Sequence, residues 1–345
     1  MTAAPVLVVG GGPAGLAAAA ELAAAGRPVE IAELRPALGG AYHRRPIPGV
    51  APWPIGRASE ARWTRLVAGI ERQEVRVRLR TGFLGVDGAG FSMLEDRASG
   101  RVETLRPAAI VIATGAVETI RPRPGWDLPG VTTAGGLQVM MKETGRLPEG
   151  RVLLAGSGPL LVALAGQMIS AGKAPVAIVE ASDPFLHPLA GLGLLAHPKP
   201  LLEAAGHMAR IFATRVPWRR ATTLEAIEAS GDELGATLVD RRGARERITV
   251  DHVALHDGIR SNDHGFPEAS PVADALPFVA WAGDCREVLG VAAAEVDGRR
   301  VGAEIAARLG GSPIAAEAAL RNLAAARRAQ DILARVFAPA RPQTP

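Results

Sequence analysis

Val6-Leu7-Val8-Val9-Gly10-Gly11-Gly12-Pro13-Ala14-Gly15, near the start of the sequence, is the stretch that most strongly indicates the fold. The apolar run predicts a buried strand, the glycines predict a tight turn, and the alanine-rich sequence that follows predicts a helix. In this GxGxxG pattern Gly10 makes the turn, Gly12 lets the backbone approach a diphosphate, and Gly15 lets the helix pack closely on the strand. A diphosphate would lie at the helix N-terminus, beside Pro13-Ala14.

The next strand supports a dinucleotide at this turn. It is expected over residues 28–31 and leads to Glu33, which lies 23 residues after Gly10. A carboxylate at that distance can accept hydrogen bonds from the ribose of an adenosine, and it disfavours a 2'-phosphate. The alternative is a tight turn in an empty Rossmann unit, because glycine-rich turns before helices also occur without a ligand.

A loop follows this strand, over residues 34–45. Its two adjacent glycines, ending at Gly40, permit close backbone approach to a ligand. Arg35 and Arg44 could meet phosphates or the edge of a flavin, and the alternative is surface arginines in an irregular loop. The candidate cofactor contacts of this loop are Leu34, Arg35, Gly40, Ala41 and Arg44.

Two later strands bring further candidates to the same edge of the sheet. Residues 108–112 form a continuous apolar run that predicts a strand buried on both faces, and Ala113-Thr114-Gly115 follows it. Residues 277–281 predict another such strand, which leads to Gly283-Asp284. The carboxyl ends of parallel strands meet at the ligand edge of a sheet, so we expect both segments to lie near the glycine turn.

Asp284 and the helix after it suit the flavin half of FAD. The carboxylate can accept hydrogen bonds from ribityl hydroxyls. The following helix, which carries Val301, Ile305 and Leu309, could aim its N-terminal amides at a flavin carbonyl and stabilise negative charge on the reduced ring. Val291 completes the candidate cofactor contacts. The alternative is an aspartate that caps a helix without a ligand.

A second copy of the opening pattern lies in the middle of the chain, over residues 151–161. Gly156 and Gly158 take its first two glycine positions, and Glu180 follows Gly156 by 24 residues. The third glycine position holds Leu161, whose side chain should push the helix away from the strand, so we expect NADH to bind weakly or not at all. If a nicotinamide cofactor binds, Glu180 favours NAD(H). The alternative is a Rossmann-type domain kept for its shape and subunit contacts.

The chain length of 345 residues favours two domains. A proline-rich stretch at residues 122–131 predicts a domain crossing. The second domain is therefore expected over residues 121–271, inserted in a first domain of residues 1–120 and 272–345. Within the second domain we expect helix and loop over 185–210, with His187, His197 and His207 lacking metal-ligand spacing, and strands over 211–216, 220–228, 234–240 and 247–255.

Composition and charge exclude several classes of protein. The formal net charge is +4, but the basic residues are scattered and almost all are arginine, which favours solvated faces over a nucleic-acid surface. Cys285 is the only cysteine, so an intrachain disulfide, a CxxC pair and an iron–sulfur motif are impossible in this chain, and a buried small apolar role is expected for it. No leader and no membrane span are expected, which favours a cytoplasmic protein.

The segments at the ligand edge together resemble a known family. Gly10–Gly15, Glu33, Ala113-Thr114-Gly115 and Gly283-Asp284 resemble the two-dinucleotide-domain flavoproteins, which have a glutathione-reductase-type fold. That resemblance implies an α/β fold with two Rossmann-like domains, the second inserted in the first. More narrowly, residues 124–131, Thr133–Gly136, Gln138 and residues 155–161 resemble FAD subunits of heteromeric amino-acid dehydrogenases of the opine oxidase, hydrogen cyanide synthase and D-hydroxyproline dehydrogenase type.

The resemblance implies a division of labour among subunits. FAD is expected in this chain, amine or amino-acid oxidation in a second flavoprotein subunit, and electron transfer through a small iron–sulfur subunit. The chain departs from the family pattern at Ala41, where glutamine is usual, at Asp257–Arg260, where the turn is usually more apolar, and in ending at Pro345 without a cysteine-rich segment. An iron–sulfur cluster is therefore expected only on a partner.

The function expected from the sequence is that of an FAD-dependent oxidoreductase subunit. No nucleophile with a base and no metal site is evident in the sequence, so the catalytic residues stay unassigned and the flavin is expected to carry the chemistry. Two alternatives stay open. One is a freestanding NADH-dependent FAD reductase, and the other is a flavin-stabilised scaffold for a catalytic partner.

Overall fold

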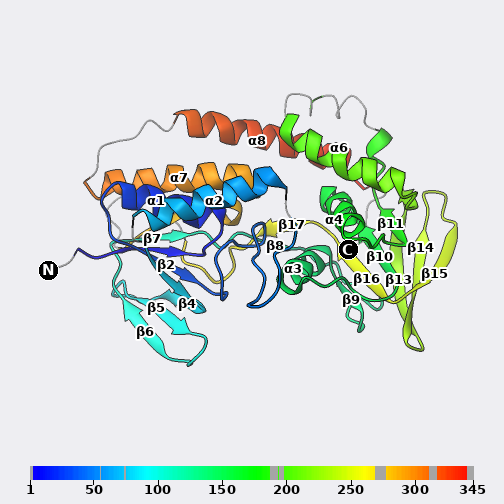
Figure 1. Cartoon of the computed structure of the whole chain (residues 1–345), viewed down its shortest axis with the longest axis horizontal. Coiled ribbons are helices and arrows are strands. Elements are labelled where there is room, and N and C mark those ends of the chain that lie inside the picture. The colour runs from blue at the N-terminus through cyan, green and yellow to red at the C-terminus, as the bar shows by residue number, and fades with distance from the viewer. Residues whose placement is uncertain are drawn as a thin grey trace. The chain divides into compact units, whose positions relative to one another are not determined.

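A computed structural model describes residues 3–54, 56–73, 75–186, 193, 198–268, 277–310 and 317–339. The chain forms two compact units (Figure 1), the first from residues 1–47, 52–117 and 260–326 and the second from residues 48–51, 118–259 and 327–345. The chain thus passes between the units after Ile47, Ala51, Val117, Ile259 and Ala326. His187, His197, Pro345 and the predicted boundary at 271/272 lie outside the described residues.

The first unit is built on a five-stranded parallel sheet. Its order is β18 (Phe278–Trp281), β7 (Ala109–Ile112), β1 (Val6–Val9), β2 (Val29–Glu33) and β3 (Arg76–Leu79). In β1, Val6 and Val8 belong to the core on one face, and Leu7 and Val9 to the core on the other. Because both faces are covered, the strand is a continuous apolar run without alternation.

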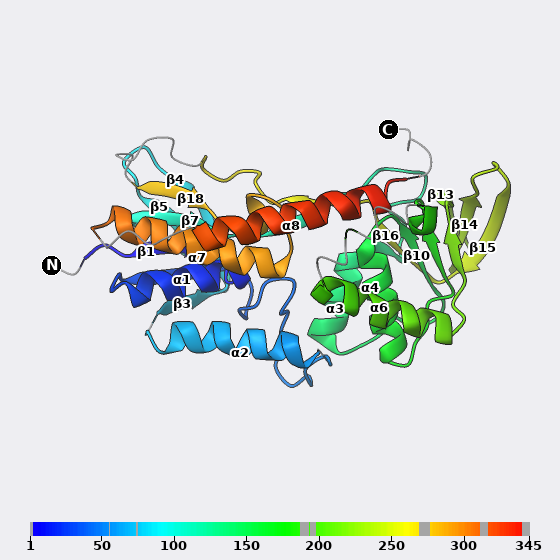
Figure 2. The same cartoon turned by 90° about the horizontal axis from the view of Figure 1, so that it is seen from above.

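Helices cover one face of this sheet and a small antiparallel sheet covers the other. The helices are α1 (Pro13–Ala24), α2 (Arg57–Glu71) and α7 (Val291–Arg308), with α1 between the other two (Figure 2). The small sheet consists of β4 (Thr81–Val86), β5 (Ser92–Asp96) and β6 (Val102–Leu105).

Two glycines of α7 allow it to touch α1 along its backbone. A Cβ on Gly298 would lie 2.1 Å from the carbonyl oxygen of Ala14, and one on Gly302 would lie 2.7 Å from that of Ala18. Alanines on one helix and glycines on the other therefore set the helix separation, with the middle of α7 against the start of α1.

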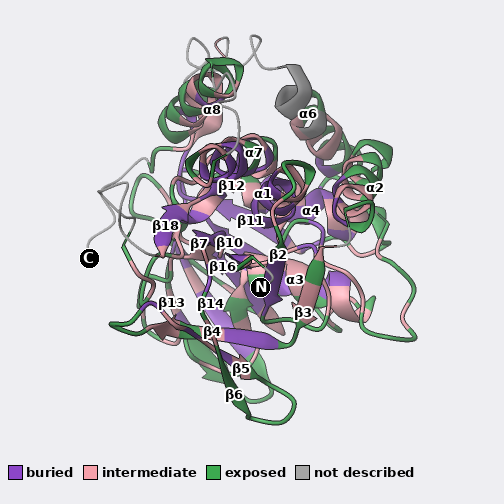
Figure 3. Ribbon diagram, turned by 90° about the vertical axis from the view of Figure 1, so that its left-hand side faces the viewer, coloured by how far each residue is buried: buried purple, intermediate pink, exposed green. Residues whose placement is uncertain are grey.

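The second unit repeats this plan around its own parallel sheet. The order is β12 (Trp218–Arg220), β11 (Ala177–Glu180), β10 (Val152–Gly156), β16 (His252–His256) and β9 (Val131–Thr133). An antiparallel sheet of β13 (Thr223–Ser230), β14 (Glu233–Val239) and β15 (Arg245–Val250) shares a core with it. The central strands of both parallel sheets are buried (Figure 3).

The helices of the second unit are α3 (Ala134–Thr144), α4 (Pro159–Ser170) and α6 (Pro198–Ala213). His207 of α6 lies against Gly166 of α4, where a Cβ would meet its ring at 2.2 Å. The α/β class with two Rossmann-like units, the second inserted in the first, is thus confirmed.

Two local predictions in the second unit are wrong. Residues 211–216 form the end of helix α6 and the turn after it, not a strand. Ile211 is a fully buried helix residue, and a short apolar run does not distinguish a buried helix end from a strand. The proline-rich stretch lies inside the second unit and is not a crossing. The amide of Ile227 donates to Pro124 O at 2.8 Å, and a side chain on Gly125 would collide with the carbonyl of Ile227.

The remaining elements are short, except for one helix. They are β8 (Ala116–Glu118), which pairs with β17 (Ile259–Ser261), the single turns η1 (Pro184–Leu186) and η3 (Gly283–Cys285), and helix α8 (Glu317–Val336). In the described part of the chain, no helix combines the length and apolar character needed to cross a membrane.

Candidate functional site

The first glycine turn is held by backbone contacts that only glycine permits. Gly10 has a φ of +105°, and its Cβ would lie 2.5 Å from the carbonyl oxygen of Ala113. A Cβ on Gly15 would lie 1.9 Å from the carbonyl oxygen of Gly10. Both glycines therefore have the positions that the motif predicts, one in the turn and one where α1 meets β1.

The start of α1 has no side-chain cap and lies against a glycine of the loop after β2. Gly12 is the N-cap of α1, Pro13 follows it, and no side chain of the described residues caps the helix. A Cβ on Gly12 would have only the Cα of Gly40 within 4 Å, at 3.7 Å, and Gly40 itself has a φ of +62°. The two glycine backbones are thus in contact, and the uncapped amides at the positive end of the α1 dipole suit a diphosphate beside them.

Glu33 shapes this turn from within. Its Oε2 accepts a hydrogen bond from the Gly11 amide at 2.7 Å, its Oε1 accepts one from the Arg35 amide at 2.8 Å, and the residue is buried. A carboxylate oxygen can accept a second hydrogen bond, so a ribose would share oxygens that already hold the loop. The sequence pointed to the residue, but its contact with the turn was not visible there.

The loop after β2 is more open. Leu34, Arg35 and Ala41 are exposed, and Arg44 is partly buried. His43, between Ala41 and Arg44 in sequence, is buried and packs with Trp63 at a ring distance of 5.7 Å. This contact fixes the loop beside α2, while the candidate side chains stay accessible to a ligand.

The segment after β7 is joined to the chain where it returns to the first unit. Thr114 Oγ1 donates to Asn262 O at 2.9 Å, and the Asn262 amide donates to Gly115 O at 3.0 Å. Ala113 is buried against Gly10. These three candidates therefore lie next to the glycine turn through their backbone.

Gly283 and Asp284 also lie beside that turn. Gly283 has a φ of +77°, and its Cβ would be 2.6 Å from the Cβ of Ala14 at the start of α1. Asp284 Oδ1 accepts the amides of Leu289 and Gly290, each at 3.0 Å, and α7 begins at the next residue, Val291, without a side-chain cap. Burial raises the pKa of Asp284.

Asp297 of α7 holds this turn, and the sequence did not identify it. Its Oδ2 accepts hydrogen bonds from the Gly283 amide, at 2.8 Å, and from Nε of Arg286. Its Oδ1 accepts hydrogen bonds from Nη2 of Arg286 and from Nε of Arg300. Burial opposes ionisation, but hydrogen bonds from Arg286 and Gly283 outweigh it and lower the pKa of Asp297. A charged Asp297 thus positions Gly283, and with it Asp284.

The second glycine turn differs from the first. Gly158 is the N-cap of α4 and has a φ of +126°, whereas Gly12 has a φ of −81°. Glu180 is fully buried, and it accepts the Gly158 amide at 3.3 Å and Ser182 Oγ at 2.8 Å. Burial raises the pKa of Glu180. Its carboxylate is inside the protein, so it is unavailable to a ribose in this conformation.

Leu161 is also fully buried. In the first unit, a Cβ at the equivalent Gly15 would lie 1.9 Å from the carbonyl oxygen of Gly10, so a leucine could not take the place that Gly15 has there. The prediction of weak or absent NADH binding stays a prediction.

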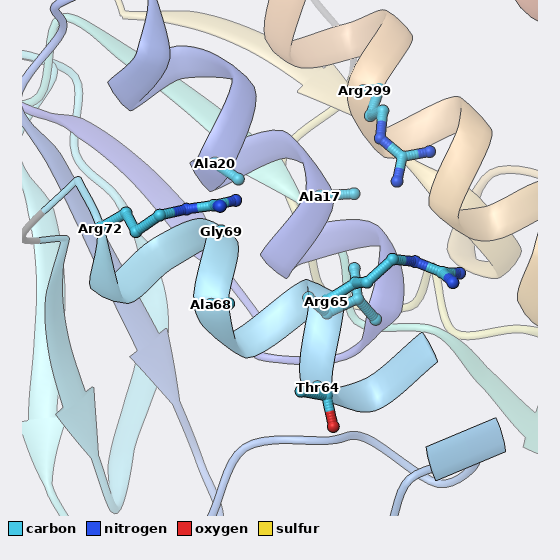
Figure 4. A pocket seen from close by; sticks show the side chains of 9 residues that line it. Ala17, Ala20, Thr64, Arg65, Ala68, Gly69, Arg72 and Arg299 are labelled. Atoms are coloured by element: carbon cyan, nitrogen blue, oxygen red, sulfur yellow. The ribbon is translucent and has the colours of Figure 1, made fainter. Parts of the chain in front are cut away.

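A groove of about 400 Å³ lies in the first unit away from these residues (Figure 4). It runs between α1, α2 and α7, and small residues such as Ala17 and Gly69 line it. Arg65, Arg72 and Arg299 also line it. None of the candidate cofactor residues lines it. Among the described residues, no group of three or more His, Cys, Asp or Glu side chains is arranged to hold a metal ion.

Comparison with curated proteins finds relatives over most of the chain. It is 31% identical over 330 residues to hydrogen cyanide synthase subunit HcnB of Pseudomonas aeruginosa, covering 85% of this chain and 68% of that protein. It is 32% identical over 279 residues to an opine oxidase subunit of Rhizobium meliloti, covering 75% of this chain and 57% of that protein. The chain thus spans between 57% and 68% of the length of these relatives. The resemblance inferred from the sequence is confirmed.

Solved structures share the fold at low identity. L-proline dehydrogenase from P. horikoshii matches with a TM-score of 0.62 and 17% identity, over 99% of this chain and 61% of that one. Thioredoxin reductase of T. acidophilum matches with a TM-score of 0.62 and 16% identity, over 88% of this chain and 98% of that one. A family model described as pyridine nucleotide-disulphide oxidoreductase matches residues 4–275. The chain therefore belongs to the pyridine nucleotide-disulphide oxidoreductase family.

Proposed function

We propose that this chain is the FAD-binding subunit of a heteromeric amino-acid or amine dehydrogenase. The observation that carries the proposal is the uncapped start of α1 at the first glycine turn, where a Cβ on Gly12 would have only the Gly40 Cα within 4 Å. A diphosphate there would accept hydrogen bonds from backbone amides and gain from the helix dipole. The names of the relatives, which are subunits of larger enzymes, support the rest of the assignment.

The residues at the ligand edge have distinct roles in this proposal. Gly12, Gly40 and the first amides of α1 bind the diphosphate, and Glu33 orients the turn and faces the adenosine side. Asp284 and the start of α7 at Val291 bind the ribityl and pyrimidine side. When bound, FAD supplies the two-electron redox chemistry. The protein contributes binding, orientation and the positive end of α7, which favours negative charge at that place.

The single cysteine argues against disulphide reduction by this chain. Cys285 is buried, its thiol donates to Ile112 O at 3.1 Å, and burial raises the pKa of Cys285. A dithiol pair is impossible within the 345 residues because no second cysteine exists. Electrons would instead arrive from a second flavoprotein subunit that oxidises the amino acid or amine, and a small iron–sulfur protein is a further proposed partner.

A freestanding NADH-dependent FAD reductase is the second candidate. It is favoured by the second parallel sheet with its own glycine turn at Gly156 and Gly158, and NAD(H) would be its nucleotide. The different backbone at Gly158 and the buried Glu180 weigh against it.

Flavin identity tests the proposal. The purified chain should release FAD rather than FMN on acid treatment, because the uncapped start of α1 suits a diphosphate, which FMN lacks. Gly12→Val should lower bound FAD about tenfold or more, since a branched side chain would occupy the volume that a diphosphate needs beside this backbone. Gly56→Val is the matched control, because Gly56 is also a helix N-cap with negative φ and open space around its Cβ. Release of FMN, or equal FAD loss in both variants, would contradict the proposal.

A further inference from the structure

The first glycine of each turn has the same neighbour in the sheet, and the side chain of that neighbour differs between the two units. In the first unit, a Cβ on Gly10 would meet the carbonyl oxygen of Ala113 at 2.5 Å. In the second unit, Gly156 pairs with His256, and its Cβ would meet the carbonyl oxygen of His256 at 1.9 Å. His256 therefore occupies the position that Ala113 has in the first unit.

The larger side chain fills the space beside the second glycine of the motif. His256 is 3% exposed, and its Nε2 lies 3.4 Å from the position that a Cβ of Gly158 would take. At the equivalent Gly12, only a backbone atom of Gly40 lies within 4 Å. The second glycine is where a dinucleotide diphosphate approaches the backbone. The imidazole ring thus lies beside the one glycine that a diphosphate must reach.

Glu118 holds this ring in place. Its Oε1 is 3.1 Å from Nδ1 of His256, and its Oε2 accepts the Gly136 amide in the first turn of α3 at 3.2 Å. Burial opposes ionisation of Glu118, but the hydrogen bond with His256 is first among the contacts that outweigh burial and lower the pKa of Glu118. A carboxylate paired with Nδ1 fixes the ring beside the turn.

The turn itself has lost a donor for an anion. Glu180 takes the Gly158 amide, whereas in the first unit Glu33 takes the amide of Gly11 instead of that of Gly12. The amide of the second glycine is therefore committed in the second unit. This is independent of His256 and points in the same direction.

We propose that His256, positioned by Glu118, excludes dinucleotides from the second glycine turn and so determines which electron donors can reduce the flavin of this chain. Nicotinamide dinucleotides are rejected. The inference deepens the proposed function and rests on it, because it concerns the donor of a flavin subunit. His256 is the specificity-determining residue, and Glu118 is a positioning residue that acts through it.

NADH titration of the full chain with its bound flavin tests this inference, with binding followed by calorimetry. The wild type should have a dissociation constant above about 1 mM, and His256→Ala should bind about tenfold tighter or better. His252→Ala is the matched control, because His252 lies at the other end of the same strand and should leave binding unchanged. Leu161→Gly alone should also leave it unchanged. A thermal unfolding midpoint equal to that of the wild type reports that each variant is folded.

Glu118 needs a separate readout. Glu118→Ala should tighten NADH binding because the ring is released, while Glu118→Gln, which keeps an oxygen for Nδ1–H, should behave as the wild type. Tight binding to the wild type, no gain in His256→Ala, or a gain in Leu161→Gly alone would overturn the inference. The proposed function is tested separately, by flavin identity and by the need for a partner.

Discussion

At the scale of single residues, Asp297 controls the turn that carries Asp284. It is 1% exposed and receives the Gly283 amide together with two arginines. Asp297→Ala should lower the free energy of unfolding by about 3 kcal/mol, because it leaves buried donors without their acceptor. Glu304→Ala on the same helix is the control, since Glu304 is partly exposed, also pairs with Arg300 and should cost less than about 1 kcal/mol. Urea unfolding of both variants gives the comparison, and equal losses would contradict the role of Asp297.

The same residue predicts a pH dependence. The pKa of Asp297 is lowered in the folded chain from an ordinary value of 3.8, so the unfolded chain binds its proton more readily. Its contribution to stability should be complete above pH 3.8 and should be lost as the pH falls through the folded value. Stability measured against pH should therefore fall less steeply in Asp297→Asn than in the wild type. Parallel curves would contradict this assignment.

The acidic residues show what could be predicted from residue spacing. Glu33 and Glu180 were identified because each ends the second strand of a βαβ unit at a characteristic distance from a glycine turn. Their hydrogen bonds back to Gly11 and Gly158 depend on backbone angles that the spacing does not reveal. Asp297 gave no signal, because an aspartate inside a helix is ordinary unless its distant partner is known.

At the scale of elements, the contact of α1 with α7 supports the candidate site. A Cβ on Gly298 would lie 2.1 Å from Ala14 O, so Gly298→Ala should force the helices apart and cost about 1–3 kcal/mol. Gly206→Ala in α6 is the matched control, because a Cβ there meets only the end of the Arg210 side chain, at 3.6 Å. That change should stabilise by about 0.4–1 kcal/mol. Thermal unfolding distinguishes them, and a stable Gly298→Ala would contradict the packing account.

Prediction of elements succeeded where the apolar pattern was long or followed by glycine. The buried strands β1, β7 and β10 were predicted because both their faces are covered, which leaves no polar position in the run. Residues 211–216 were assigned wrongly because a buried helix end and a short strand present the same apolar residues. Only packing against neighbouring elements distinguishes those cases.

At the scale of the whole molecule, the repeated motif predicted two Rossmann-like units, and the chain has two, each with its own parallel sheet. The repeat in the sequence does not show that the two glycine turns differ. His256 replaces the small side chain of Ala113, and it was not recognised because it lies about 100 residues after the glycines beside it. Contacts between residues so distant in sequence follow from strand order, which a local motif does not contain.

We propose that this chain binds FAD but does not itself oxidise an amino acid. Anaerobic stopped-flow absorbance of its flavin is the most direct test. The purified chain is mixed with proline, glycine and opine-type substrates, alone and with the protein that co-purifies with it. We expect the spectrum of the oxidised flavin to stay unchanged for the chain alone, and the flavin to be reduced when the partner is present. Rapid bleaching of the flavin by any of these substrates without a partner would contradict it.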